Sequence, residues 1–368
     1  MSDRWRDRSI AEIGRVVTGT TPSTTRTDYF GGSIPFATPG DLGKSLFLLE
    51  TARTLTTTGL EQAKAIPQGS ILFSCIGVIG KAAIAGRTLA TNQQINALVC
   101  DAKEVDNIFV YYVLRYRKPE IESLAGRQVV SIVNKSTFER FVLRLPPLAE
   151  QRRIGLILRT WERGVEEFNN LRAAVNRQKD ALLHAILTER HRFPETGNRR
   201  WKTVFLGDIC NPKQWRTLPA SALSGSSEGV PVFGATGLIG YFTEANHYED
   251  TVIISCRGTC GEVMIVPGPS YITGNAMCLD ELHEDVIGKQ LLAEIVRFTG
   301  THRIVSGSAQ PQITRQSLMD FKIRIPPKPV QRHLETLLST CDRALSLLTS
   351  KIRLLEKQQR GLMQELLR

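Results

Sequence analysis

The sequence contains the stretch Arg144-Leu145-Pro146-Pro147-Leu148-Ala149-Glu150-Gln151-Arg152, and 180 residues later the related stretch Arg324-Ile325-Pro326-Pro327-Lys328-Pro329-Val330-Gln331-Arg332. Each copy closes a region rich in glycine, proline and β-branched residues, and each opens a long region with a helical pattern. The order along the chain is therefore domain, long helix, domain, long helix. Such a repeat sets the architecture of the whole chain. Two similar halves indicate a protein that contacts two similar partners at once.

Apolar residues recur in steps of four and three along both predicted helices, as they do at the a and d positions of a heptad repeat. In the second helix this seam consists of Leu334, Leu338, Cys341, Leu345, Leu348, Ile352, Leu355, Gln359, Leu362 and Leu366. In the first helix the matching positions are Ile154, Leu158, Trp161, Val165, Phe168, Arg172, Val175, Lys179, Leu182 and Ile186. Lys179 corresponds to Gln359, and a polar seam residue commonly fixes the register of a coiled coil.

The seams are narrow stripes rather than broad apolar faces, which favours packing of the two helices on each other. The alternative is that each helix packs on its own domain. Pro147 and Pro327 suit helix starts, where the N–H that proline lacks is not needed, and the first helix should end before Pro194. If the helices pair antiparallel, the halves are related by an approximate two-fold axis. Duplex DNA has a local two-fold axis of the same kind.

We therefore predict an α+β protein with an internal pseudo-two-fold repeat. Two similar mixed α/β domains are joined by two long helices that form an antiparallel coiled coil. The predicted segments are a first domain at 1–145, a first helix at 146–190, a linker at 191–200, a second domain at 201–325 and a second helix at 326–368.

The composition is that of a folded, basic protein. Hydrophobic residues make up 42%, and 47 Lys and Arg against 36 Asp and Glu give a net charge of +11. This excess favours a polyanionic partner such as nucleic acid, or an acidic protein surface. We expect no membrane span, because no apolar run is long enough, and no signal peptide, because the charged N-terminus has no apolar core behind it.

The seven cysteines are scattered along the chain. Cys256 and Cys260 have no second pair at zinc spacing, and the six histidines show no such spacing either, so we expect no metal site. Reduced thiols in the cytoplasm are the simplest interpretation.

Each domain contains a glycine-bearing turn between two strand-like segments, at 74–81 and at 255–262. A GxxG turn can lie against a phosphate backbone. An ordinary hairpin turn without a ligand fits the same pattern. Neither turn is a P-loop, which needs GxxxxGK[ST] leading into a helix.

Each domain also ends on a segment with Gln, Asn or Arg, at 127–135 and at 308–315. These side chains can make bidentate contacts with base edges, although single ones commonly belong to a solvated loop. No catalytic motif is evident: the stretch 211–214 only begins like the Asn/Asp-Pro-Pro-aromatic loop of amino-methyltransferases, and 233–237 is a weak glycine motif. The pattern favours a binding or scaffold role.

Together these features resemble a type I restriction–modification specificity subunit over essentially the whole chain. In the first half the similar stretches are Thr18-Gly19-Thr20-Thr21-Pro22-Ser23, Tyr29-Phe30-Gly31-Gly32, Ile34-Pro35-Phe36-Ala37-Thr38-Pro39-Gly40-Asp41-Leu42, Gly69-Ser70-Ile71-Leu72 and Thr91-Asn92-Gln93-Gln94. In the second half they are residues 230–241 and Thr273-Gly274-Asn275-Ala276. The second half lacks the Asn-Gln-Gln run and resembles another subtype of target recognition domain, which implies two unlike half-sites.

The resemblance implies that each domain is a target recognition domain for one half of a split, asymmetric double-stranded DNA sequence. It further implies that the paired helices hold the half-sites apart and carry two methyltransferase (modification) subunits, which bind S-adenosylmethionine and methylate adenine N6. A restriction subunit is a further partner of such complexes. This chain would itself hold no cofactor and catalyse no reaction, and it would act in the cytoplasm of a prokaryote.

Residue type and repeat position give candidate contacts, which we state as predictions. In the first domain the candidate DNA-binding residues are Thr21, Arg26, Lys44, Lys81, Asn92, Gln93, Arg127, Gln128, Asn134 and Lys135. In the second domain they are Arg257, Arg303, Gln310, Gln312 and Arg315. The candidate helix–helix contacts are Ile154, Leu158, Trp161, Val165, Phe168, Leu338, Leu345, Leu348, Ile352 and Leu355.

Two other hypotheses remain open at this point. The chain could be another kind of non-catalytic nucleic-acid scaffold, for instance one that binds structured RNA. It could also be an enzyme whose site has no familiar motif, in which case the isolated chain would transfer methyl groups.

Overall fold

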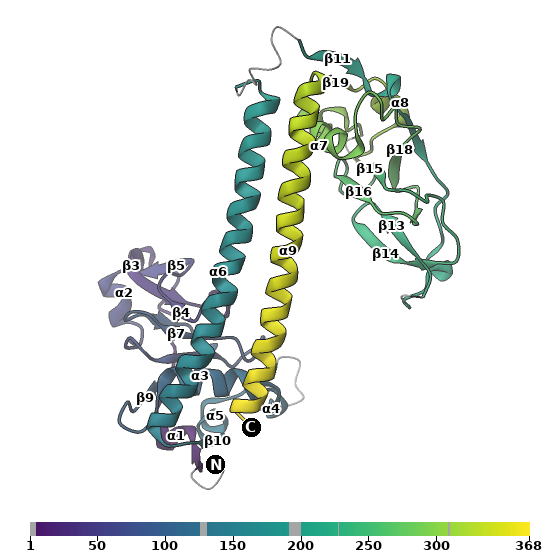
Figure 1. The fold of residues 1–368 in the computed structure, drawn as a ribbon. Coiled ribbons are helices and arrows are strands. Elements are labelled where there is room, and N and C mark those ends of the chain that lie inside the picture. Colours follow the sequence, from purple (N-terminus) through teal and green to yellow (C-terminus); the bar gives the residue numbers. More distant parts are fainter. Residues whose placement is uncertain (1–4, 126–130, 191–199, 227, 308–309) are drawn as a thin grey trace. The chain divides into compact units, whose positions relative to one another are not determined.

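The protein is described from a computed structural model that covers residues 5–125, 131–190, 200–226, 228–307 and 310–368. Contacts within the chain define two compact units. Unit 1 contains residues 1–169 and 350–368, and unit 2 contains residues 170–349. Each unit therefore combines one domain with part of each long helix (Figure 1).

Unit 1 contains a five-stranded sheet in the order β2-β9-β6-β7-β4, a three-stranded sheet in the order β5-β3-β8, and the strand pair β1-β10. Its strands are β1 (Arg6–Ser9), β2 (Gly14–Thr18), β3 (Phe30–Ala37), β4 (Phe47–Leu48), β5 (Arg53–Leu55), β6 (Ile71–Ser74), β7 (Ala82–Ala85), β8 (Ala90–Thr91), β9 (Ile95–Cys100) and β10 (Val142–Leu145). Its helices are α1 (Ile10–Ile13), η2 (Thr27–Tyr29), α2 (Thr57–Glu61), α3 (Asn107–Tyr116), α4 (Lys118–Ser123) and α5 (Lys135–Arg140).

The main core of unit 1 lies between the five-stranded sheet and helix α3. Helix α3 begins at Asp106, whose side chain accepts a hydrogen bond from the N–H of Phe109 at 2.9 Å and so caps the helix. Phe109 is fully buried, and Phe73 from β6 stacks on Phe138 from α5 with ring centroids 5.2 Å apart. Burial of such a side chain contributes roughly 2 to 3 kcal/mol, which makes these aromatic residues a main source of stability.

Unit 2 has a similar organisation, but its larger sheet has four strands instead of five. Its sheets have the orders β12-β18-β15-β16 and β14-β13-β17, with the strand pair β11-β19. Its strands are β11 (Lys202–Phe205), β12 (Asn211–Gln214), β13 (Val230–Gly234), β14 (Gly237–Phe242), β15 (Thr251–Ser255), β16 (Val263–Val266), β17 (Tyr271–Ile272), β18 (Ala276–Asp280) and β19 (Lys322–Ile325). Its short helices are η4 (Leu206–Asp208), η5 (Ala220–Ala222), α7 (Lys289–Thr299), η6 (Thr301–Ile304) and α8 (Arg315–Met319).

The sequence repeat is also a repeat of strand register. In unit 1 the first strand pairs antiparallel with the last, with Arg6 opposite Leu145, and in unit 2 Lys202 lies opposite Ile325. The last strands β10 and β19 alternate between exposed and buried residues in the same order. The prediction of two similar mixed α/β domains is therefore confirmed.

The two long helices are α6 (Leu148–Leu187) and α9 (Lys328–Leu366). Each begins directly after its Pro-Pro pair, and α6 ends before Pro194, as predicted. Within the described residues, no helix is both long and apolar enough to span a membrane.

The long helices pack both on the domains and on each other. In unit 1 the core includes Ile154 and Leu158 from the start of α6, and Leu362 and Leu366 from the end of α9 pack against it. In unit 2 the end of α6 and the start of α9 share one core in the same way, through Leu183, Ile186, Leu187, Leu334 and Leu338. The start of one helix thus meets the end of the other in both units, which confirms antiparallel pairing.

All ten of the candidate helix–helix contact residues are at least partly covered. Ile154, Leu158, Leu338 and Ile352 are buried, and Trp161, Val165, Phe168, Leu345, Leu348 and Leu355 are half-buried. Both packing alternatives from the sequence are therefore realised by the same helices.

Candidate nucleic-acid interface

In unit 1, four loops that lie far apart in the sequence meet beside the five-stranded sheet. They are the loop after β2, the loop between β8 and β9, the turn between β6 and β7, and the segment before α5. Backbone hydrogen bonds join them in series: Thr20 N–H to Thr91 O at 2.9 Å, Cys75 N–H to Gln94 O at 2.8 Å, and Gly77 N–H to Ser131 O at 3.0 Å. Two of the sequence motifs selected for DNA contact, the turn and the domain-end segment, are thus neighbours.

Unit 2 builds the same loop cluster. The N–H of Cys256 donates to Asn275 O at 3.0 Å, and the N–H of Ile313 donates to Cys256 O at 3.1 Å. Arg257 and Gln312 form an isolated β-bridge, which corresponds to the bridge between Ile76 and Ile132 in unit 1. The turn and the domain-end segment are therefore joined side by side in both domains.

Both glycine-bearing turns are hairpin turns closed by a serine. The Ser74 hydroxyl accepts from the N–H of Lys81 at 2.9 Å and donates to Val78 O at 2.6 Å. Ser255 bonds in the same way to Glu262 and Thr259. The hairpin interpretation is thus confirmed, while contact with a phosphate stays a prediction.

The tips of these turns are open to an incoming ligand. Gly77 and Gly258 have positive φ angles of 74° and 76°, and a Cβ atom at either position would meet nothing within 4 Å. In unit 1 Val78 is 57% exposed. A backbone with this exposure can approach another molecule closely.

In unit 1 the structure brings two of the candidate residues into contact. The Thr21 hydroxyl donates to Gln93 Oε1 at 2.7 Å. Asn92 instead bonds to Gln94, and Asn134 caps α5 by accepting from the N–H of Thr137 at 2.8 Å. The Asn134 amide oxygen is thus already used within the fold.

The basic candidates of unit 1 differ in their surroundings. Arg26 forms an ion pair with Asp28 at 2.8 Å, and this hydrogen-bonded pair holds the pKa of the Asp28 carboxyl below its usual value. Lys135 pairs with Glu139 at 3.5 Å. Lys44 is exposed and Lys81 is half-buried. Arg127 and Gln128 lie outside the described residues.

In unit 2, Arg257, Arg303, Gln310 and Gln312 are exposed. Arg315 is held by its own domain, because its Nε donates to Pro212 O and its Nη2 donates to Asn211 Oδ1, both at 2.9 Å. Those two bonds dock the start of α8 on β12.

Comparison with known proteins follows the same division into two halves. A family model described as the type I restriction modification DNA specificity domain matches residues 2–177 and 198–357. The chain belongs to this family. The matched ranges give one copy of the specificity domain to each half of the repeat.

Curated relatives and solved structures agree with this assignment. The chain is 27% identical over 147 residues to the HindI specificity subunit of Haemophilus influenzae, a match that covers 39% of this chain and 32% of that protein. The EcoprrI specificity subunit of Escherichia coli is 21% identical, over 90% of this chain and 86% of that protein. With HindI and the MjaIX subunit of Methanocaldococcus jannaschii, the chain thus spans only about a third of each relative's length (32% and 37%).

The solved structures support the fold. The S subunit of a type I restriction–modification system from M. genitalium matches with a TM-score of 0.69 and 17% identity, covering 100% of this chain and 97% of that one. A chain from a study of complex assembly and conformational transition of the type I R-M system matches with a TM-score of 0.60 and 17% identity, covering 100% of this chain and 98% of that one.

One residue of the second specificity domain was missed by sequence analysis. Gln214, at the end of β12, donates from Nε2 to Gly274 O and to Cys256 Sγ, both at 2.9 Å. It therefore ties β12 to two loops of the cluster. In the sequence, residues 211–214 resemble only an incomplete methyltransferase motif. The sequence does not show that β12 pairs with β18, and this pairing places Gln214.

The long helices are tied to the specificity domains by an acidic residue at the same repeat position. In unit 1, Glu162 on α6 accepts hydrogen bonds from Tyr112 and Arg115 on α3. In unit 2, Asp342 on α9 accepts from Gln290 on α7 and from the seam residue Lys179 at 2.9 Å.

Lys179 is the polar seam residue that the sequence marked as a register device. Its Nζ lies 2.9 Å from Asp342 and 3.4 Å from Glu294, and its side chain is only 13% exposed. Burial acts to lower the pKa of Lys179, but the Asp342 hydrogen bond and the Glu294 charge outweigh it and raise the pKa above the ordinary value. The residue thus links α6, α9 and α7 as a cation.

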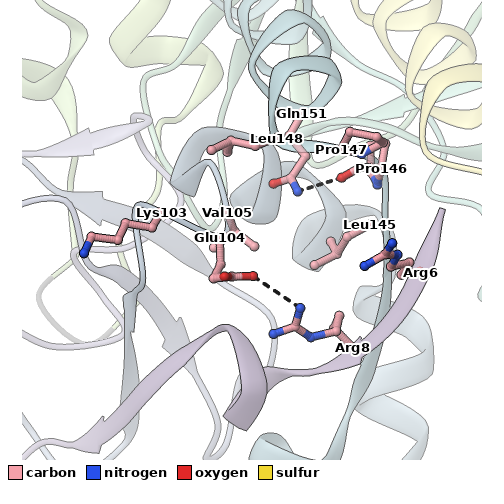
Figure 2. Close-up of a pocket in the computed structure, with 10 residues that line it drawn as sticks. All are labelled: Arg6, Arg8, Lys103, Glu104, Val105, Leu145, Pro146, Pro147, Leu148 and Gln151. Atoms are coloured by element: carbon pink, nitrogen blue, oxygen red, sulfur yellow. Dashed lines mark hydrogen bonds and ion pairs between the residues drawn. The ribbon is translucent and has the colours of Figure 1, made fainter. Parts of the chain in front are cut away.

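A cavity of about 560 Å³ lies where the first specificity domain passes into α6 (Figure 2). Arg6, Arg8 and Lys103 give it a basic lining, and Arg8 pairs with Glu104 at 3.3 Å. On the opposite side, Gln151 Nε2 donates to Pro146 O at 2.9 Å. The cavity thus lies at the first copy of the repeated stretch, residues 144–152.

Proposed function

We propose that this chain is the DNA specificity subunit of a type I restriction–modification complex. Each specificity domain recognises one half of a split, asymmetric target in double-stranded DNA. The chain provides recognition and assembly, and its partner subunits provide the chemistry.

The observation that carries this proposal is the repeated loop cluster. In each domain the open glycine turn is bridged to the domain-end segment, through Arg257 and Gln312 in unit 2 and through Ile76 and Ile132 in unit 1. A backbone turn suits contact with a phosphate, and the adjoining polar side chains suit contact with base edges. Two such clusters in one chain support a target with two parts.

The side chains of the two clusters differ, which supports an asymmetric target. Unit 1 presents the Thr21–Gln93 pair, whereas unit 2 presents Arg257 and Gln312 at its bridge. Arginine favours guanine and glutamine favours adenine at base edges. The two half-sites should therefore have unlike sequences.

The partners follow from the family assignment. We propose that two modification subunits assemble on the chain, bind S-adenosylmethionine and methylate adenine N6, and that a restriction subunit joins the same complex. The outer faces of α6 and α9 offer contact area, since Leu156 and Leu347 are 63% and 64% exposed. Such a complex would act on the chromosome in the prokaryotic cytoplasm.

A binding experiment with the assembled complex tests the proposal. The affinity for duplex DNA should fall steeply with salt, because the +11 charge would release counterions from the phosphates. Specific duplex should also compete at least about 1,000-fold better than random duplex. Structured RNA that competes as well as specific duplex would favour the RNA-scaffold hypothesis, and methyl transfer by the isolated chain would favour a hidden enzyme.

A further inference from the structure

Three side chains of types that can bind a metal ion lie close together in unit 2. His247 comes from the loop between β14 and β15, and Cys278 and Asp280 come from β18. One ligand atom from each of the three residues lies within 4.8 Å of the other two. Cys278 is fully buried, and the side chains of His247 and Asp280 are 10% and 14% exposed. Alternation along β18 puts Cys278 and Asp280 on the same face of the sheet.

The groups around these three residues are arranged as they are around a bound metal ion. Asn246 is fixed by two bonds to the backbone of Ile272, with Oδ1 accepting at 2.8 Å and Nδ2 donating at 3.0 Å. This orientation directs Asn246 Oδ1 at His247 Nδ1, 2.8 Å away. A metal-bound histidine commonly donates its other N–H to an oxygen of this kind.

The carboxylate of Asp280 is oriented in the same manner. Trp215 Nε1–H donates to Asp280 Oδ2 at 3.1 Å, which leaves Oδ1 facing His247 Nε2 at 3.0 Å. Both ring nitrogens of His247 therefore face oxygen atoms. A metal ion between Nε2 and Oδ1 would replace the contact between these two atoms and leave Asn246 and Trp215 in place.

We propose that His247 Nε2, Cys278 Sγ and Asp280 Oδ1 bind one divalent transition-metal ion of the zinc class. Nitrogen, sulfur and oxygen donors of these types form tetrahedral zinc sites. In such a site the ligand atoms lie roughly 3.3 to 3.8 Å apart, as metal–ligand lengths of about 2.0 to 2.3 Å dictate. His247 Nε2 and Asp280 Oδ1, 3.0 Å apart, would have to separate slightly, and all three ligand atoms already lie within 4.8 Å of one another. His247 and Asp280 also line a cavity of about 570 Å³.

The site would join the two sheets of the second specificity domain. Asp280 ends β18 in the four-stranded sheet, while His247 bridges Ser270 beside β17 of the three-stranded sheet. In unit 1 the matching register places Val99 opposite Arg15, as Asp280 lies opposite Asn211. Ala97 and Val99 therefore occupy the positions of Cys278 and Asp280, and the ligand set is particular to the second domain.

Metal titration of the purified full-length chain, with its modification subunit if solubility requires it, tests the proposal. Equilibrium dialysis against Zn²⁺ or Co²⁺ should give one ion per wild-type chain, and Co²⁺ should give a thiolate-to-metal charge-transfer band. Cys278→Ser should abolish the band, while Cys210→Ser, at another buried cysteine of unit 2, should retain it. Asp280→Asn should weaken binding by at least about ten-fold.

If Cys278→Ser does not fold, a variant that leaves all three ligands in place provides a second test. Trp215→Phe retains the aromatic ring but removes the N–H that orients Asp280, and it should weaken metal affinity about ten-fold while the metal-free melting temperature changes little. Absence of stoichiometric metal in the wild-type chain would overturn the proposal. So would a charge-transfer band and a metal affinity that Cys278→Ser, Asp280→Asn and Trp215→Phe all leave unchanged, because the ion would then be bound by other residues.

Discussion

Gln151 and Gln331 make the same hydrogen bond at equivalent places in the two units. The Nε2 of each donates to the carbonyl oxygen of the first proline in its Pro-Pro pair, Pro146 or Pro326, at 2.9 Å in both. Both glutamines are almost fully buried, at 2% and 4% exposure. The bond fixes the turn at which the last strand of a specificity domain passes into a long helix. The repeated sequence is thus a repeated joint.

Replacement of Gln151 by alanine should destabilise unit 1. Gln151 Oε1 also accepts from the N–H of Asp106 at 3.0 Å, so the change leaves two backbone groups without their partner. We expect the free energy of unfolding to fall by about 1 to 3 kcal/mol, measured by urea denaturation. The exposed neighbour Arg152→Ala is the control, and an equal effect of the two variants would contradict a role for the joint.

Replacement of Lys179 by methionine should weaken the attachment of α7 to the long helices. The change leaves Asp342 and Glu294 without the cation between them, and we expect a loss of about 1 to 3 kcal/mol. A double-mutant cycle with Asp342→Asn should show a coupling of at least about 0.5 kcal/mol. Independent, additive effects of the two changes would mean that the ion pair does not hold the register.

Lys179 should also make the stability of unit 2 depend on pH. Its folded pKa is raised above the ordinary value of 10.5, so its contribution is fully present below that value and is lost as the pH rises through the folded pKa. In alkaline unfolding experiments, the wild-type chain should therefore lose stability more steeply than Lys179→Met. Equal loss of stability with rising pH in the two chains would contradict this role of Lys179.

Asp41 should stabilise unit 1 through its charge. Its carboxylate accepts from the N–H of Thr38 at 2.8 Å and of Ala52 at 3.0 Å. Burial acts to raise the pKa of Asp41, but these hydrogen bonds outweigh it and hold the pKa below its ordinary value of 3.8. The stabilisation is thus present above 3.8 and lost as the pH falls through the lower, folded value.

Asp41→Asn should therefore lower the free energy of unfolding by about 1 to 3 kcal/mol at neutral pH, and it should flatten the acid limb of the stability curve. Unfolding followed over a series of acidic buffers measures both effects. Glu61→Gln, at an exposed position on α2, is the matched control and should change neither.

The sequence was sufficient to predict the repeat, the two domains and the long helices, because heptads and the Pro-Pro pairs are local signals. It was less accurate at the ends of the helices. Leu182 continues the heptad but is 37% exposed, whereas Leu183 is buried at 6%. A straight helix drifts by about 20° per heptad from a strict seven-residue repeat, so its buried face passes to the next residue.

Contacts between distant segments could not be predicted from the sequence. Arg315 was selected as a base contact by residue type, but its bonds to Asn211 and Pro212 depend on the packing of α8 on β12. His247 and Asp280 meet across 33 residues through strand pairing, and no spacing rule signals this. Residue type and repeat position selected loops that meet in the fold, while the partner of each side chain could be found only from the structure.

Gln312, at the bridge between the turn and the domain-end segment of unit 2, should contribute to recognition of one half-site only. Gln312→Ala should reduce discrimination in one half-site by about 1 to 3 kcal/mol and leave the other half-site unchanged. Selection from a randomised duplex library, with the assembled complex, measures this. An equal loss of affinity for all sequences would instead assign Gln312 to the phosphate backbone.

Asn134→Ala, at the helix cap of unit 1, should mainly lower stability.

If the long helices set the gap between half-sites, their length should set its size. Deletion of one heptad from both helices, in register, removes about 10 Å of helix. At about 3.4 Å per base pair the recognised gap should shorten by roughly three base pairs. An unchanged gap would show that α6 and α9 hold partners without measuring distance.

The most direct measurement is the methylation pattern of genomic DNA after co-expression of this chain with a modification subunit. We predict N6-methyladenine at a single split motif, which disappears when this chain is omitted. A stable complex that methylates no split motif, or one whose pattern is the same without this chain, would contradict the assignment of specificity to these two domains.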